Sequence, residues 1–145
     1  AIAASEGRLR RNFQGYTTDQ ADALVGFGAS AISRTPSGYA QNAPDIAGYT
    51  RAVEAGRLPI VKDIELTSDD KLRAHIIERL LCDFAIDLDA VASPHAFNDE
   101  IAALTPFVDA GLVRIDGGRI TIPTPGRSFA RLIAAAFDAY LPANR

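Results

Sequence analysis

The first clear pattern of hydrophobic residues in the second half of the chain has a helical period. Over residues 69–84 they stand three or four positions apart, as on one face of an amphipathic helix. Thr67, with Asp70 three positions later, has the pattern of a capping box at the start of this helix. The side chains expected to face the core are Leu72, Ile76, Ile77, Leu80, Leu81 and Phe84.

A second helix is expected after Ser93-Pro94. Pro106 falls inside its pattern and should kink or break it, because proline has no backbone N–H to donate. The expected inward residues of this helix are Phe97, Ile101, Leu104 and Val108.

The pattern then becomes alternating over residues 111–123. Val113 and Ile115 alternate with polar neighbours, the letters "DGG" provide a turn, and Ile120 and Ile122 alternate on the return. This arrangement predicts a β-hairpin.

A last helix is expected after Thr124-Pro125, which has the residue types of a helix start. The order helix, helix, hairpin, helix predicts a winged-helix-like domain over residues 66–145. The residues expected on the inward side of the last helix are Phe129, Leu132, Ile133, Ala136, Phe137 and Tyr140.

The first part of the chain has shorter apolar segments. Residues 21–33 form an apolar run bounded by turn signals, and Gly26 and Gly28 disfavour a helix, so a buried strand is predicted there. Turns should follow over residues 34–44, which contain Pro, Gly and Asn, and then a helix over 44–55 that ends at a glycine. The apolar stripe of this helix is Ile46, Tyr49 and Val53, and the extended segment 58–66 is expected to point Val61, Ile64 and Leu66 inward.

Composition narrows the class of protein. The chain has 145 residues, 48% hydrophobic and 23% charged, which is typical of a globular domain. No apolar run approaches the roughly 20 residues that span a bilayer, and no signal peptide is visible, so no membrane partner is expected. Cys82 is the single cysteine; a disulfide within the chain or a thiolate metal site is therefore not expected, and a cytoplasmic location fits.

Charge argues against one function of winged helices, DNA binding. The net charge is −3, and the predicted second helix carries Asp99, Glu100 and Asp109 but no Lys or Arg. A helix that reads DNA needs basic and amide side chains, so no nucleic-acid partner is expected. A free-standing protein- or nucleic-acid-binding module remains an alternative.

Three motifs in the first fifty residues carry a family resemblance. "RNFQGYTT" (residues 11–18), "GFGASAIS" (26–33) and "YAQN" (39–42) resemble the C-terminal part of the oxygen-independent coproporphyrinogen III oxidases, also called coproporphyrinogen dehydrogenases. "ERLLCDF" and "AAAFDAYL" fit the same family, so the resemblance covers nearly the whole chain. A heme-chaperone relative is a further alternative, although such relatives share the general architecture and do not carry "RNFQGYTT".

The resemblance implies an α/β (α+β) fold in which residues 1–65 end a partial (β/α) barrel and residues 66–145 form the winged-helix-like domain. It implies a radical S-adenosylmethionine enzyme that uses a [4Fe-4S] cluster to decarboxylate two propionates of coproporphyrinogen III oxidatively, giving protoporphyrinogen IX. The family's C-x3-C-x2-C cluster motif is absent here. The chain lacks methionine as well, so a processed chain or a piece of a longer one is expected, inactive alone and without bound cofactor or metal.

Carried over residue by residue, the resemblance assigns Gln14 and Ile32 as S-adenosylmethionine contacts, with Ile32 at the end of the predicted barrel strand. Arg11 is a weaker candidate for binding porphyrinogen carboxylates, since arginine binds carboxylates with two parallel hydrogen bonds. From the residues alone, Gln14 could equally order a loop, Ile32 belong to a core and Arg11 be solvated. Because the rest of a barrel is missing, residues 24–32 are expected to be rearranged, disordered or buried in an oligomer contact.

Overall fold

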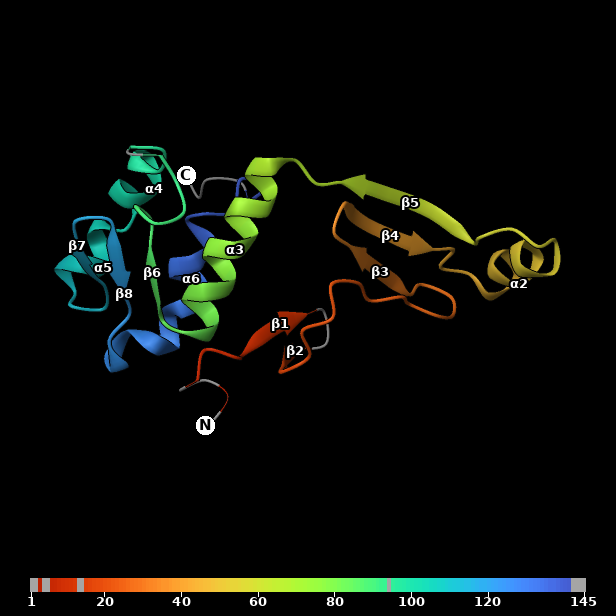
Figure 1. Cartoon of the computed structure of the whole chain (residues 1–145), viewed down its shortest axis with the longest axis horizontal. Coiled ribbons are helices and arrows are strands. Elements are labelled where there is room, and N and C mark those ends of the chain that lie inside the picture. Colours follow the sequence, from red (N-terminus) through yellow and green to blue (C-terminus); the bar gives the residue numbers. More distant parts are fainter. Residues whose placement is uncertain (1–2, 4–5, 13–14, 94, 142–145) are drawn as a thin grey trace. The chain divides into compact units, whose positions relative to one another are not determined.

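The computed structural model describes residues 3, 6–12, 15–93 and 95–141. The chain divides into two compact units (Figure 1). The smaller unit comprises Gln20–Ser68, and the larger one comprises Asp69–Arg145 together with Ala1–Asp19.

Helices of the larger unit follow the predicted order. Helix α3 spans Ser68–Cys82 and confirms the helical period of this region. The predicted second helix is interrupted, as α4 (Asn98–Ala103) and α5 (Thr105–Asp109), with Pro106 in the first turn of α5. This confirms the predicted break, because a proline at the first turn removes no intrahelical hydrogen bond.

The larger unit contains one antiparallel sheet. Strands β7 (Arg114–Asp116) and β8 (Arg119–Thr121) form the predicted hairpin, with Gly117 at positive φ in its turn. Strand β6 (Ala85–Asp87) pairs with the other edge of β8, which gives the order β6-β8-β7. The sequence did not predict β6, because three residues are too short for an alternating pattern to stand out.

The core of the larger unit lies between α3, the sheet and the C-terminal helices, which Figure 1 shows gathered around it. Residues predicted to face inward from α3 and from the hairpin are buried or packed against the core. The members that are fully buried and largest are Phe137, Ile76, Leu80, Leu104, Ile120, Ile122, Ile133, Val113 and Cys82.

The last helix departs from its predicted inward side. Its first turns are a 3₁₀ helix, η1 (Thr124–Phe129), and only Ala130–Ala135 form an α-helix, α6. A 3₁₀ turn has about 3.0 residues rather than 3.6, so a single helical period cannot describe both segments. Phe129 and Leu132 are exposed, and so is Tyr140, which lies beyond the end of α6; Ile133 and Phe137 are buried as predicted, and Val108 of α5 is exposed.

The N-terminal polar stretch is a small hairpin in which no strand was predicted. Strand β1 (Arg10–Asn12) pairs antiparallel with β2 (Gly15–Thr17), and Arg11 stands opposite Tyr16. Its residues lack the apolar alternation by which strands are recognised, because the hairpin is a two-stranded ribbon rather than part of a core sheet.

The smaller unit is a three-stranded antiparallel meander with one helix. Strands β3 (Ile32–Thr35), β4 (Gly38–Asn42) and β5 (Ile60–Glu65) pair in the order β3-β4-β5. The buried strand predicted over 21–33 is wrong for most of its length: residues 21–31 form a loop with an isolated bridge from Leu24 to Arg34, and only Ile32 and Ser33 belong to a strand, β3. Of the segment expected to form turns, only Pro36 and Ser37 turn, since β3 and β4 together occupy most of it.

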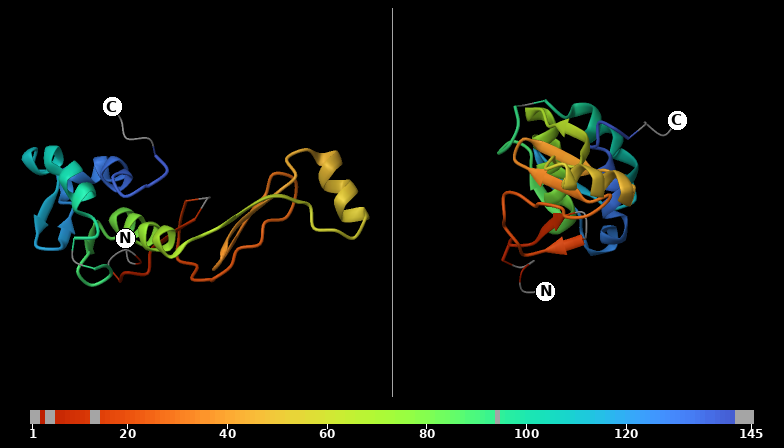
Figure 2. Two further views of the ribbon diagram at one scale, coloured as in Figure 1. Left: turned by 90° about the horizontal axis from the view of Figure 1, so that it is seen from above. Right: turned by 90° about the vertical axis from the view of Figure 1, so that its right-hand side faces the viewer.

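Helix α2 spans Ile46–Glu54, close to the predicted bounds. Asp45 accepts a hydrogen bond from the Gly48 N–H at its start, and Gly56 lies just beyond its end at positive φ. The predicted apolar stripe is largely exposed, because α2 lies beyond the ends of the strands and not against a face of the sheet (Figures 1 and 2). Along β5, Val61 and Ile64 are exposed as well, which corrects their predicted inward positions.

Candidate functional site

The glycine-containing loop before β3 is held by a buried asparagine. The Asn42 side-chain Nδ2 donates to the carbonyl oxygens of Gly26 at 3.2 Å and Gly28 at 3.0 Å. The Asn42 side chain is polar, yet among the described residues Asn42 counts as buried, with 6% of its surface exposed. "GFGASAIS" and "YAQN", separate motifs in the sequence, therefore form one hydrogen-bonded structure.

Other groups of the smaller unit bind the backbone N–H groups of the same loop. The Gly26 N–H donates to Ser33 Oγ at 3.0 Å, and the Gly28 N–H donates to Tyr49 Oη of α2 at 3.1 Å. The Ser30 N–H donates to the Ala43 carbonyl at 2.9 Å. Both N–H and C=O groups of the two glycines thus have partners, which defines the loop conformation.

Steric and backbone requirements explain the small residues of this loop. A Cβ atom at Gly26 would lie 2.8 Å from the Ile32 carbonyl oxygen, closer than real Cβ atoms approach. Gly28 has φ +101° and Ser30 has φ +62°, in the left-handed region that glycine adopts most readily. Between the two glycines, Phe27 projects outward and is 87% exposed.

Ile32 is the first residue of β3, not the last residue of a barrel strand as predicted. It is half-buried and pairs with Gln41 of β4, directly after the loop. The structure therefore places this candidate ligand contact next to the loop that Asn42 holds.

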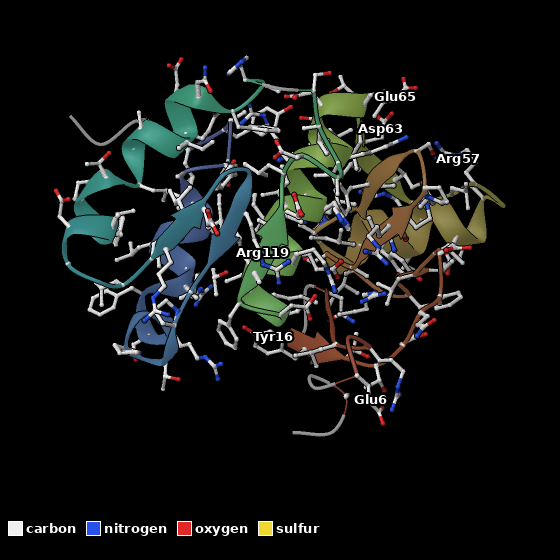
Figure 3. All side chains as sticks on the ribbon, turned by 60° about the vertical axis from the view of Figure 1, so that its left-hand side comes forward. Glu6, Tyr16, Arg57, Asp63, Glu65 and Arg119 are labelled. Carbon is white, nitrogen blue, oxygen red and sulfur yellow. The ribbon has the colours of Figure 1, made fainter. Side chains whose placement is uncertain are left out.

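The N-terminal hairpin is anchored on α3. The Arg11 backbone N–H donates to Glu78 Oε1 at 3.1 Å, and the Arg79 guanidinium donates to the Leu9 carbonyl at 3.1 Å. Tyr16 Oη donates to the Leu81 carbonyl at 3.4 Å, and Figure 3 shows Tyr16 beside the C-terminal end of α3. "RNFQGYTT" is therefore joined to "ERLLCDF", a connection that nothing in the sequence indicated.

Two candidate ligand contacts, Gln14 and Arg11, belong to the "RNFQGYTT" motif. Gln14 lies outside the described residues, so its contact with a ligand stays a prediction. Arg11 is half-buried in β1, where its backbone is engaged by Glu78.

The described residues do not fit an iron–sulfur cluster. They contain no group of three or more His, Cys, Asp or Glu side chains that could hold a metal ion. Cys82 is buried at the end of α3, and burial raises the pKa of its thiol above the usual value, which disfavours the thiolate that a metal requires. A cluster held by several thiolates needs cysteines from outside this sequence, which has one.

Among the described helices, none combines the length and the apolar character required to cross a lipid bilayer.

Known proteins resemble the chain over almost its whole length. The HemN C-terminal domain family matches residues 66–129. The oxygen-independent coproporphyrinogen III oxidase of Bradyrhizobium diazoefficiens is 47% identical over 97% of this chain, and that of Cereibacter sphaeroides is 40% identical over the same share. Each match covers 32% of the relative, so the chain spans about a third of the length of these proteins.

A solved structure agrees with these relatives. The coproporphyrinogen III oxidase (HemN) of Escherichia coli, described as a radical SAM enzyme, superposes with a TM-score of 0.91 at 36% identity. The match covers 97% of this chain and 34% of that one. The chain is thus similar, over 97% of its length, to about a third of the length of the oxygen-independent coproporphyrinogen III oxidases, and its residues 66–129 match the HemN C-terminal domain family.

Proposed function

We propose that this chain is the C-terminal part of an enzyme that oxidatively decarboxylates coproporphyrinogen III to protoporphyrinogen IX without oxygen. The observation that carries the proposal is the similarity to oxygen-independent coproporphyrinogen III oxidases over 97% of the chain. In the whole enzyme, S-adenosylmethionine and a [4Fe-4S] cluster supply the radical chemistry. The residues of this chain bind and orient ligands and exclude water, and the enzyme works in the cytoplasm.

We assign residues 1–65 to the end of a partial (β/α) barrel with its connector and residues 66–145 to a winged-helix-like domain. The order α3, β6, α4 with α5, the β7–β8 hairpin and the final helix supports the second assignment. In the smaller unit, the exposed Val25 and Phe27 support the expectation that this segment is covered in a larger assembly. Oligomers of the chain alone, detected by light scattering, are the expected consequence.

We assign Gln14 and Ile32 to S-adenosylmethionine and Arg11 to a propionate of the substrate. The position of Ile32 beside a well-ordered loop supports its assignment, because a ligand contact needs a defined backbone. The anchoring of the Arg11 backbone by Glu78 supports the third assignment in the same way. The isolated chain is expected to be inactive, since its single cysteine cannot hold the cluster.

A chimeric enzyme tests the proposal. The matching C-terminal segment of the Bradyrhizobium diazoefficiens enzyme, which is 47% identical, is replaced by this chain. Anaerobic conversion of coproporphyrinogen III is followed by chromatography of the oxidised porphyrins. We expect activity from the chimera and none from the same enzyme without the segment or from this chain alone. A chimera that assembles its cluster but converts no substrate would contradict the proposal.

Substitutions in the chimera test the contacts. Ile32→Ala should raise the KM for S-adenosylmethionine, whereas Ile115→Ala, at a half-buried isoleucine of β7, should leave it unchanged. Arg11→Ala should raise the KM for the porphyrinogen, and Arg131→Ala, at an exposed arginine of α6, serves as its control. Equal effects of test and control variants would refute the assignments.

A further inference from the structure

Asn42 occupies an unusual position for an amide side chain. It is buried at the end of β4, and the pairing of β4 with β5 shifts register at this point: Gln41 stands opposite Lys62, but Asn42 stands opposite Ile60. Such bulges re-aim a side chain locally. Here the amide of Asn42 reaches the carbonyl oxygens of Gly26 and Gly28.

The donor capacity of Asn42 matches this task. A side-chain amide nitrogen has two N–H groups, and the two glycine carbonyls accept one hydrogen bond each. The Asn42 backbone N–H adds a third bond to the same segment, donating to the Ala31 carbonyl at 2.9 Å. One residue therefore binds the loop on both sides of Phe27 and immediately before Ile32.

The exposure of Phe27 indicates that this ordering does not serve a core within the described residues. A loop fixed for packing would direct its large aromatic ring inward, whereas Phe27 is 87% exposed. Fixed backbone with an outward apolar side chain is the arrangement of a preorganised contact surface.

We propose that Asn42 is a positioning residue: by holding the Gly26–Ile32 loop, it sets the affinity for S-adenosylmethionine at Ile32. The inference rests on the proposed function, which assigns Ile32 to that ligand. Asn42 does not itself touch the ligand; it acts through the backbone of Gly26 and Gly28.

Asn42→Asp is the sharpest perturbation, because it keeps the shape and replaces the donor by an oxygen facing two carbonyl oxygens. Tyr49→Phe is a milder second variant that keeps the ring and removes only the acceptor of the Gly28 N–H. Asn98→Asp makes the same chemical change at an exposed residue at the start of α4 and is the matched control.

Two measurements are made on these variants. Hydrogen exchange of the isolated chain should show faster exchange at Gly26 and Gly28 in Asn42→Asp, with β7 and β8 of the larger unit unaffected. In the chimera, the KM for S-adenosylmethionine should rise about tenfold in Asn42→Asp and less in Tyr49→Phe, while kcat and the porphyrinogen KM stay nearly constant. Asn98→Asp should match the unmodified protein in both measurements.

Failures of the two ideas are distinguishable. Unchanged exchange at Gly26 and Gly28 in Asn42→Asp would show that Asn42 does not hold the loop. Faster exchange with an unchanged S-adenosylmethionine KM would show that the loop does not set the affinity, and the proposed function would stand. An equal loss of kcat and of both affinities would mean a general structural role. An unmodified chimera without activity would refute the proposed function, and the assignment of this site with it.

Discussion

Leu132 and Ile133 are adjacent residues of α6 with opposite environments. Ile133 is 0% exposed in the core of the larger unit, and Leu132 is 61% exposed. Substitution of either residue by alanine removes three carbon atoms from the same helix, so the two variants differ mainly in burial.

The expected costs follow from that difference. Three buried methyl or methylene groups contribute about 2.4 kcal/mol at ~0.8 kcal/mol each, and the cavity left behind adds to this, so Ile133→Ala should lower the free energy of unfolding by about 2–5 kcal/mol. Only about two fifths of Leu132 is covered, which scales its cost to about 1 kcal/mol or less.

Urea unfolding followed by circular dichroism at the helical band measures both costs. With a slope of about 2 kcal/mol per molar, Ile133→Ala should lower the midpoint by roughly 1 M or more, and Leu132→Ala by less than about half of that. Equal shifts of the two midpoints would refute the placement of α6, because a single apolar stripe over the last helix would then describe it better.

Three further outcomes are expected. Gly38→Ala should disrupt the pairing of β4 with β5, since a Cβ atom there would overlap the Ile64 carbonyl oxygen, and hydrogen exchange along β5 should become faster; unchanged exchange would contradict the register. Cys82 should react with a thiol reagent much more slowly in the folded chain than in urea, and fast labelling of the folded chain would contradict its burial. Because burial raises the pKa of the Cys82 thiol in the folded chain, its contribution to the free energy of unfolding should be complete below about pH 8.5 and be lost as the pH rises through the folded pKa. Arg79→Ala should release the hairpin of β1 and β2 from α3, seen as faster amide exchange in both strands, whereas Arg131→Ala should not.

Prediction from the sequence succeeded best where an element packs against neighbours on one face only. The helical period of α3 and the alternation of β7 and β8 identified buried residues correctly, because each of these elements contributes one apolar side to the core. Pro106 marked the break between α4 and α5 for a local reason that needs no tertiary information.

Prediction failed where apolar residues lack a packing partner in the described structure. Val61 and Ile64 were expected to face inward, yet both are exposed on β5; three positions apart on one strand, they point to opposite faces of the sheet. The apolar run over 21–33 was interpreted as a strand, although a buried amide from β4 holds its central part as a loop. Nothing local to that run specifies a hydrogen bond from a residue more than ten positions away.

The amino-acid sequence by itself determined the resemblance to oxygen-independent coproporphyrinogen III oxidases, through "RNFQGYTT", "GFGASAIS" and "YAQN", and the order of helices and hairpin after residue 66. Only the tertiary structure decided that Asn42 joins two of these motifs and that α3 anchors the third. The physical reason is range: periodicity and turn chemistry act over a few neighbouring residues, whereas a hydrogen bond between distant segments exists only once the chain has folded.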